Sequence, residues 1–93
     1  MSRPPTAAKR DANEPEIVET LRAFGLSVHQ MDRPADLLVG YGARTYLVEV
    51  KMPRGTFTPP QEKFRKAWRG DYTVLRTIAE AEAFARDVRS GAR

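Results

Sequence analysis

Apolar residues recur along the chain at two different spacings, and these spacings divide it into predicted helices and strands. In segment 14–24 the apolar positions fall on one helix face, and the helix is expected to end at Gly25, which can adopt a left-handed conformation. Segment 78–89 has the same spacing and predicts a closing helix. A further helix is predicted to begin at residue 58 or 60 and to run to about residue 69.

Four other segments, 26–30, 36–41, 45–52 and 72–76, favour strands because they are rich in aliphatic, β-branched and aromatic residues. Gly42-Ala43 separates the second from the third and predicts a tight hairpin. A helix joins the third strand to the fourth, and strands joined in this way generally pair in parallel. The predicted fold is therefore α/β, in the order α-β-β-β-α-β-α, with a mixed four-stranded sheet flanked by helices.

The chain of 93 residues is expected to form one domain over residues 13–90, because it is too short for two cores. Residues 1–12 contain two prolines, a basic pair and no apolar period, which predicts a flexible basic tail. Asn13 is expected to cap the first helix, with Glu16 reaching back to it as in a capping box.

Charge and composition narrow the classes of function. The formal net charge is +4, which suits a polyanionic partner, although a generally arginine-rich proteome would explain it equally well. There is no cysteine and only one histidine, His29, so a metal would need oxygen ligands. No apolar run is long enough to cross a membrane and no secretory signal is visible, so the protein is expected in the cytoplasm.

The hairpin count brings two carboxylates together. If the turn lies at Gly42-Ala43, counting back along both strands places Asp36 opposite Glu49, and Lys51 falls on the same sheet face as Glu49. Like charges directly opposite one another are destabilising unless something compensates, and a divalent cation would do so. A cross-strand salt bridge that involves Glu49 is the alternative interpretation, because a Glu-x-Lys triplet is common by chance.

Two carboxylates, a backbone carbonyl and waters would suit Mg²⁺, and a nearby lysine amine can steer a water or stabilise developing charge. Such a site can hydrolyse a phosphodiester. Gln61 lies on the helix face expected to pack on the sheet, so it either meets a polar site or lies at the helix end near solvent. Glu16 is either a further site acid or only the capping-box residue.

The ordered set of these pieces resembles the PD-(D/E)XK nuclease superfamily, and within it the small phage-type virus replication-repair nuclease (VRR-NUC) domains, which are similar to Holliday-junction resolvases. The matching pieces extend over about residues 11 to 85. They are Asp11-x-Asn13-x-x-Glu16-Ile17-Val18, Asp36-Leu37-Leu38-Val39-Gly40, Leu47-Val48-Glu49-Val50-Lys51, Thr58-Pro59-x-Gln61-x-x-Phe64, Trp68-x-Gly70 and Val74-Leu75-Arg76. The sequence departs from the family pattern before Asp36, where Ala35 separates the aspartate from Pro34 and the loop is short, which puts substrate choice in doubt.

The resemblance implies a restriction-endonuclease-like core and a catalytic set with defined roles. Asp36, Glu49 and the Val50 carbonyl would ligate Mg²⁺ or Mn²⁺, and Lys51 would position or activate the nucleophilic water. Glu16 would contact the metal through water, and Gln61 would orient Lys51 or the scissile phosphate. The implied partner is branched or junction-containing DNA in a bacterial or phage-infected cell, cut by a homodimer.

Basic residues on the predicted loops and second helix are candidates for phosphate contacts, although a solvated helix face would also explain those on the helix. They are Arg33, Arg44, Arg54, Arg65, Lys66 and Arg69. Phe64 and Trp68 are expected in the core rather than as stacking platforms, and His29 is expected to be a structural strand residue.

Three classes of function follow from the sequence. The leading hypothesis is a Mg²⁺-dependent, structure-selective endonuclease acting on branched or flapped DNA. The alternatives are a catalytically silent DNA-binding module of the same fold, and a protein-interaction subunit whose charged strand residues form ordinary salt bridges.

Overall fold

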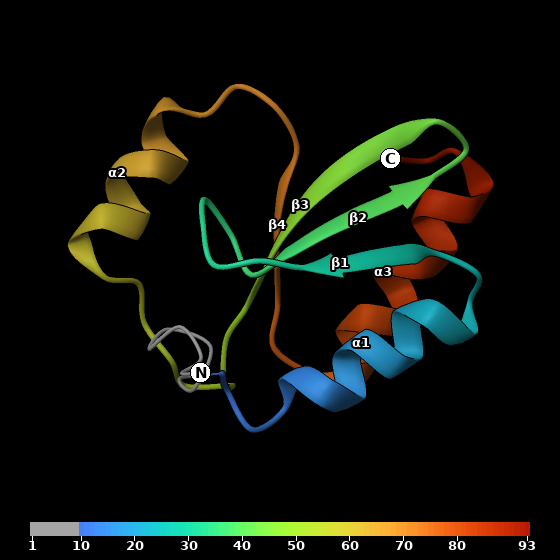
Figure 1. The fold of residues 1–93 in the computed structure, drawn as a ribbon, viewed down its shortest axis with the longest axis horizontal. Helices are drawn as coiled ribbons and strands as arrows, with labels where there is room; N and C mark the ends of the chain where they lie inside the picture. The colour runs from blue at the N-terminus through green and yellow to red at the C-terminus, as the bar shows by residue number, and fades with distance from the viewer. Residues whose placement is uncertain (1–9) are drawn as a thin grey trace, which may run out of the picture.

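A computed structural model describes residues 10–93, and its elements follow the predicted order. The elements are α1 (Glu14–Ala23), β1 (Ser27–Gln30), β2 (Leu37–Tyr41), β3 (Arg44–Val50), α2 (Pro59–Ala67), β4 (Tyr72–Leu75) and α3 (Ile78–Ser90). The fold is α/β, and the prediction of a mixed four-stranded sheet flanked by helices is confirmed (Figure 1). No helix among residues 10–93 is both long and apolar enough to cross a membrane.

The four strands lie side by side in the order β1-β2-β3-β4. β1 pairs with β2 and β2 with β3 in antiparallel fashion, whereas β3 and β4 are parallel, as expected for strands connected through a helix. The hairpin has the predicted register, with Tyr41 opposite Arg44. Its turn uses positive φ at both Gly42 and Ala43, of 58° and 66°, as a two-residue turn of the primed type requires.

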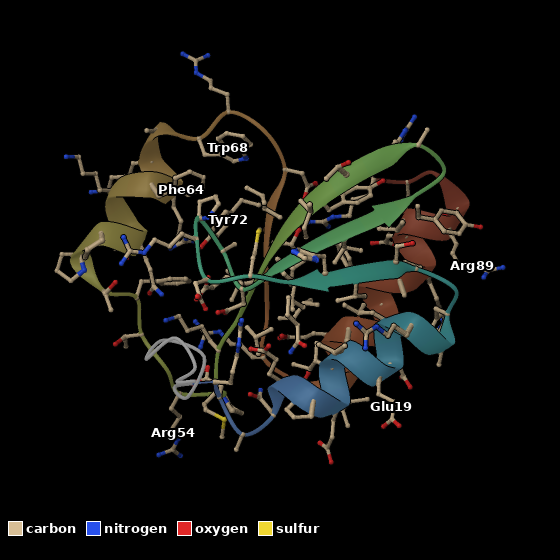
Figure 2. All side chains as sticks on the ribbon, in the orientation of Figure 1. Glu19, Arg54, Phe64, Trp68, Tyr72 and Arg89 are labelled. Atoms are coloured by element: carbon tan, nitrogen blue, oxygen red, sulfur yellow. The ribbon has the colours of Figure 1, made fainter. Side chains whose placement is uncertain are left out.

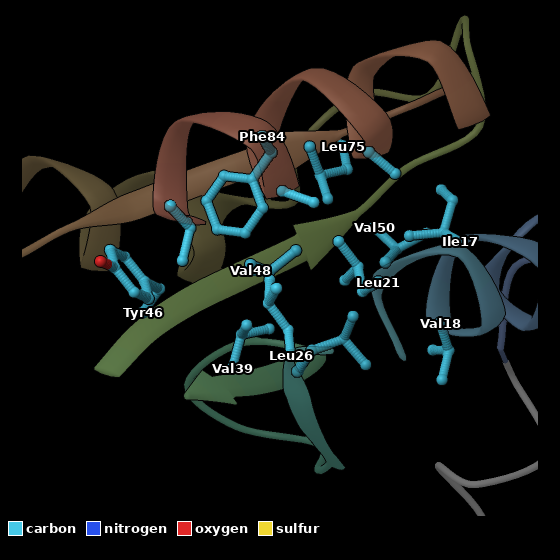
Figure 3. Close-up of a cluster of buried hydrophobic side chains, with 14 residues drawn as sticks. Ile17, Val18, Leu21, Leu26, Val39, Tyr46, Val48, Val50, Leu75 and Phe84 are labelled. Atoms are coloured by element: carbon cyan, nitrogen blue, oxygen red, sulfur yellow. The ribbon is translucent and has the colours of Figure 1, made fainter. Parts of the chain in front are cut away.

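The core lies between one face of the sheet and the two helices α1 and α3 (Figure 3). Period-two alternation sends Tyr46, Val48 and Val50 of β3 into this core, where the Tyr46 ring meets Phe84 of α3 edge to face at 5.7 Å. The intervening residues of β3 point to the opposite face of the sheet. Glu49 is therefore placed on the side of the sheet away from α1 and α3.

α2 stands on that opposite side of the sheet, and none of its residues is buried (Figure 1). Thr58 begins it with a complete capping box, in which the Thr58 side chain accepts from the Gln61 N–H and the Gln61 side chain accepts from the Thr58 N–H. The helix ends at Ala67, two residues before the predicted end. Trp68 is extended and 45% exposed, so the prediction that Trp68 lies in the core is wrong.

The N-terminal boundary also differs from the prediction. Residues 1–9 of the predicted tail lie outside the described part of the chain, but Arg10 and Asp11 are tied to the fold. The Asp11 carbonyl accepts from the Glu14 N–H, and Arg10 donates to the carbonyl of Met31. The segment that enters α1 therefore belongs to the structured domain from Arg10 onward.

Asn13 does not cap α1 with its side chain, so the predicted capping box with Glu16 is wrong. Its amide nitrogen instead donates to the carbonyls of Lys51 and Arg76, each at 3.0 Å. These two carbonyls lie just after β3 and β4. Asn13 therefore fastens the start of α1 to the ends of the two parallel strands.

Candidate active site

Asp36 and Glu49 lie together at the end of the hairpin remote from its turn. Leu37 pairs with Val48, so the register continues to Asp36 opposite Glu49, as predicted. Oδ2 of Asp36 accepts a hydrogen bond from the Val50 N–H at 2.8 Å. This contact fixes the aspartate against β3, one residue beyond Glu49.

Glu49 is nearly buried, with 4% of its surface exposed, although it lies beside a pocket. Burial raises its pKa to about 7, and the neighbouring Asp36 carboxylate adds to the rise. Lys51 opposes the shift, because its Nζ lies 3.7 Å from Oε2 of Glu49. The site therefore holds two acidic groups that disfavour each other's charge.

Gln61 reaches the same carboxylate from α2. Its Nε2 donates to Oε2 of Glu49 at 3.1 Å, and its Oε1 accepts from Nζ of Lys51 at 2.8 Å. Of the two interpretations open from the sequence, the one that places Gln61 at a polar site is confirmed. The Gln61 side chain also completes the capping box of α2. A single amide group therefore fixes both the start of this helix and the position of the Lys51 amine.

These groups border a pocket of about 460 Å³ between the sheet and α2. Its lining residues are Asp32, Arg33, Pro34, Asp36, Glu49, Thr58, Pro60, Gln61 and Phe64. The loop between β1 and β2 forms one wall and contains a cis peptide bond between Arg33 and Pro34. A small ligand that enters this pocket would meet both carboxylates.

Glu16 is not part of this site. It is exposed on α1, whereas Glu14, two residues earlier, is 1% exposed and faces the site. Glu14 accepts from Nε2 of Gln30 at 2.9 Å, and burial raises its pKa, with the nearby Asp36 also contributing to the rise. Of these two acids of α1, Glu14 and not Glu16 therefore lies near Asp36.

Arg10 is a site residue that the sequence pattern did not indicate. Its guanidinium lies 3.2 Å from Glu14, 3.4 Å from Asp32 and 3.5 Å from Asp36. It thus places a positive charge against three carboxylates from α1 and the β1–β2 loop. Arg10 lies four residues before Glu14, which is the spacing of an i,i+4 ion pair. This spacing points to the site only once Glu14 is known to face inward.

Tyr72 and Arg76 are two further neighbours to which the sequence assigned no role in the site. The Tyr72 hydroxyl is buried, and burial followed by the nearby Glu49 charge raises its pKa. Nη1 of Arg76 donates to the carbonyls of Met52, Pro53 and Gly55. Arg76 therefore holds the loop that leads from β3 toward α2.

The six predicted DNA-contacting residues are not gathered in one place. Arg33 lines the pocket, and Lys66 and Arg69 are exposed on or just after α2. Arg65 pairs with Glu62 and lies over the Phe57 ring at 3.9 Å. Arg54 is exposed on the loop after β3, and Figure 2 shows it pointing outward.

Arg44 is the one of these six that the fold separates most clearly from the pocket. It lies at the hairpin turn, five residues along β3 from Glu49, or about 17 Å at the rise of a strand. There it donates to the carbonyl of Arg93. A phosphate held at the carboxylates would not be in reach of Arg44 of the same chain.

The carboxylates at the pocket could bind one divalent metal ion, but they are too few to bind two. Among residues 10–93 there is no group of three or more His, Cys, Asp or Glu side chains arranged to hold a metal. Asp36 and Glu49 supply two carboxylates whose repulsion a cation between them would relieve. Mg²⁺ commonly binds through one or two carboxylates and keeps several waters, so this pair fits it.

Searches against protein-family models, curated proteins and solved structures found no match for this chain.

Proposed function

We propose that this protein is a metal-dependent nuclease that hydrolyses DNA phosphodiester bonds, of the PD-(D/E)XK type that the sequence resembles. The observation that carries the proposal is that Asp36, Glu49 and Gln61 line one pocket, while the amine of Lys51 contacts both Glu49 and Gln61. Two mutually repelling acids and a buried amine destabilise a small fold. Their presence together therefore points to a functional site.

Each side chain has a role in this proposal. Asp36, Glu49 and the Val50 carbonyl would hold Mg²⁺ or Mn²⁺. The ion, when bound, would polarise the phosphate and lower the pKa of a water molecule. Lys51 orients that water or stabilises charge on the phosphate, and Gln61 keeps the Lys51 amine beside Glu49. Glu14 takes the place that the resemblance gives to Glu16.

The test is nicking of a panel of linear, flapped and branched DNAs with Mg²⁺, compared with the same reactions in EDTA. Glu49→Gln and Lys51→Ala should each abolish cleavage, because one removes a metal ligand and the other the amine. Glu19→Gln is the matched control, since Glu19 is exposed on α1 and points away from the pocket (Figure 2). Cleavage that survives in EDTA or in Glu49→Gln would refute the proposal.

A catalytically silent DNA-binding module is the second candidate. It is favoured by the absence, within residues 10–93, of any group of three acidic, histidine or cysteine metal ligands. This candidate predicts salt-dependent DNA binding that Mg²⁺ does not alter. Calorimetric Mn²⁺ binding that is lost in Asp36→Asn would count against it.

We also propose that the active form is a homodimer, because one chain of this size offers little surface with which to grip branched DNA. Sedimentation of the protein at micromolar concentration tests this directly, and a monomer under those conditions would contradict it.

A further inference from the structure

Three aromatic rings form a continuous cluster from the site face of the sheet to the end of α2. Phe64 lies between the other two: its ring centroid is 5.3 Å from that of Trp68, nearly parallel at 22°, and 5.7 Å from that of Tyr72. Figure 2 shows the three side chains between α2 and the sheet. Trp68 is the outermost of them and is 45% exposed. The cluster therefore ends in a large ring that is open to solvent.

The exposed indole is held in one orientation. Its Nε1 donates to the Asp71 carbonyl at 3.1 Å, and one face stacks on Phe64. Gly70 lies so close that a Cβ there would come 2.9 Å from three indole atoms, so a larger residue at this position would displace the indole. A tryptophan that is fixed but half open does not gain the stability of full burial, and a flat apolar ligand would cover the remaining surface.

Basic residues are numerous on and next to α2, the helix that carries Phe64. Lys63, Lys66 and Arg69 are exposed on or next to α2, and within the described part of the chain none of them makes an ion pair. The helix's one internal pair uses Arg65 and Glu62. An occupant should therefore be flat, apolar in part and negatively charged. A single-stranded nucleic acid has these properties, because its bases stack on aromatic rings and its phosphates meet basic side chains.

The ring cluster is also continuous with the carboxylate pocket, because Phe64 lines that pocket together with Asp36 and Glu49. We propose that Trp68, supported from behind by Phe64, binds an unpaired nucleobase of a DNA strand whose backbone passes into the carboxylate pocket. The substrate class is then DNA with a single-stranded segment next to the cleaved bond. This substrate class rests on the proposed nuclease function. Binding of the base does not rest on it and can be measured without cleavage.

The chain supplies its own reporter, because Trp68 is its only tryptophan. The experiment titrates the protein in EDTA with an oligothymidylate of roughly 8 nucleotides, a length within the usual site size of small single-strand binders. The matched ligand is an oligomer of the same length with abasic residues, which keeps the phosphates and lacks the bases. The thymidylate should quench Trp68 fluorescence and bind more tightly than the abasic oligomer.

Variants are compared by the anisotropy of a labelled oligothymidylate, which does not need the tryptophan. Trp68→Ala should weaken binding by roughly 5- to 150-fold, the range expected for one stacked base. Trp68→Phe keeps an aromatic ring and should retain most of the affinity. Ile78→Ala is the control, because Ile78 is a similarly exposed apolar residue at the start of α3 and should have no effect.

Equal affinity for the two oligomers would overturn the inference, since it would mean that only the phosphates are bound. A fluorescence change that depends on protein concentration without DNA would also overturn it, because the rings would then be a contact between two copies of the chain. If Trp68→Ala fails to fold by circular dichroism, the comparison of the two oligomers on the wild-type protein decides. Base-dependent binding without metal-dependent cleavage would support this inference and refute the nuclease, and cleavage without base-dependent binding would do the reverse.

Discussion

Gln61 links Lys51 to Glu49, accepting from Nζ of the lysine at 2.8 Å and donating to Oε2 of the glutamate at 3.1 Å. Because one amide orients both groups, Gln61→Ala should lower DNA cleavage by about 10- to 100-fold, the usual effect of losing a residue that orients metal ligands. Single-turnover cleavage at saturating DNA measures this. Glu62→Ala, one position along the same helix, changes only an exposed pair with Arg65 and should leave the rate unchanged.

A rate in Gln61→Ala equal to that of the wild type would show that the amide serves only the capping box of α2. Gln61→Glu separates the two roles further. The glutamate can still accept from the Thr58 N–H and from Lys51, but it can no longer donate to Glu49. Its helix should therefore form normally while cleavage remains low.

The hairpin shows why part of the candidate site could be predicted from the sequence. A two-residue turn at Gly42-Ala43 sets the register of both strands, and strand alternation has a fixed period of two. The placement of Asp36 opposite Glu49, with Lys51 on the same face, depends on nothing else. Local rules along a single hairpin were sufficient.

The acid of α1 could have been found by the same kind of rule, but a competing pattern led to the wrong residue. Glu14 lies three residues before Ile17 and seven before Leu21, so it shares their buried face, whereas Glu16 does not. The resemblance to the nuclease family assigned this role to Glu16, and the capping-box pattern with Asn13 was the alternative interpretation of the same residue. Asn13 instead binds carbonyls 38 and 63 residues away, and no local pattern reveals such contacts.

Arg10 was missed, and Trp68 was wrongly assigned to the core, because both depend on long-range placement. The partners of Arg10 include Asp32, 22 residues further along the chain, and residues this close to the N-terminus look like a tail when read alone. Trp68 has the spacing of an inward-facing helix residue, but α2 ends at Ala67 and buries no residue. How closely a helix packs on a sheet depends on the conformation of the loops that connect them. Loop sequences have no hydrophobic period from which that conformation could be predicted.

Arg10→Met should destabilise the protein, because it removes the ion pair that Arg10 makes with the buried Glu14 carboxylate. The expected loss in the free energy of unfolding is about 1–3 kcal/mol, typical for removing a partner of a buried charged group. Urea unfolding at pH 7 measures it. The loss should shrink when Glu14→Gln is already present, because the two changes then remove the same interaction.

Arg86→Met is the control for that series, since Arg86 is an exposed arginine of α3 whose described contact is with the ring of Phe24 at 5.6 Å. Its unfolding free energy should change by less than about 0.5 kcal/mol, as for most surface substitutions. Equal losses in Arg10→Met with and without Glu14→Gln would contradict the assigned contact.

Asn13→Asp distinguishes a capping residue from an amide donor. Aspartate is as good a helix cap as asparagine but cannot donate to the carbonyls of Lys51 and Arg76. We expect Asn13→Asp to cost about as much stability as Asn13→Ala, about 1–3 kcal/mol for two lost hydrogen bonds in a part-buried place. Urea unfolding decides, and wild-type stability of Asn13→Asp would restore the capping role.

The raised pKa of Glu49 predicts how the stability of the metal-free protein depends on pH. Burial and Asp36 raise this pKa from 4.5 in the unfolded chain to about 7 in the folded protein. Between these values the folded protein binds a proton that the unfolded chain has lost, so stability falls as pH rises from about 4.5 to about 7 and is then constant with respect to this group. The total loss is on the order of 3 kcal/mol.

Unfolding in EDTA across this pH range, for the wild type and for Glu49→Gln, isolates the contribution of Glu49. Glu14 also has a raised pKa and adds a fall of the same sign, but it is present in both proteins and cancels in the difference. Glu49→Gln should therefore gain stability relative to the wild type as pH rises toward 7.

At pH 8, Mg²⁺ should stabilise the wild type and not Glu49→Gln, because only the wild type offers both carboxylates to the ion. A difference between the two proteins that does not change with pH would mean that Glu49 is ionised throughout, and the repulsion from Asp36 would then already be relieved without a metal.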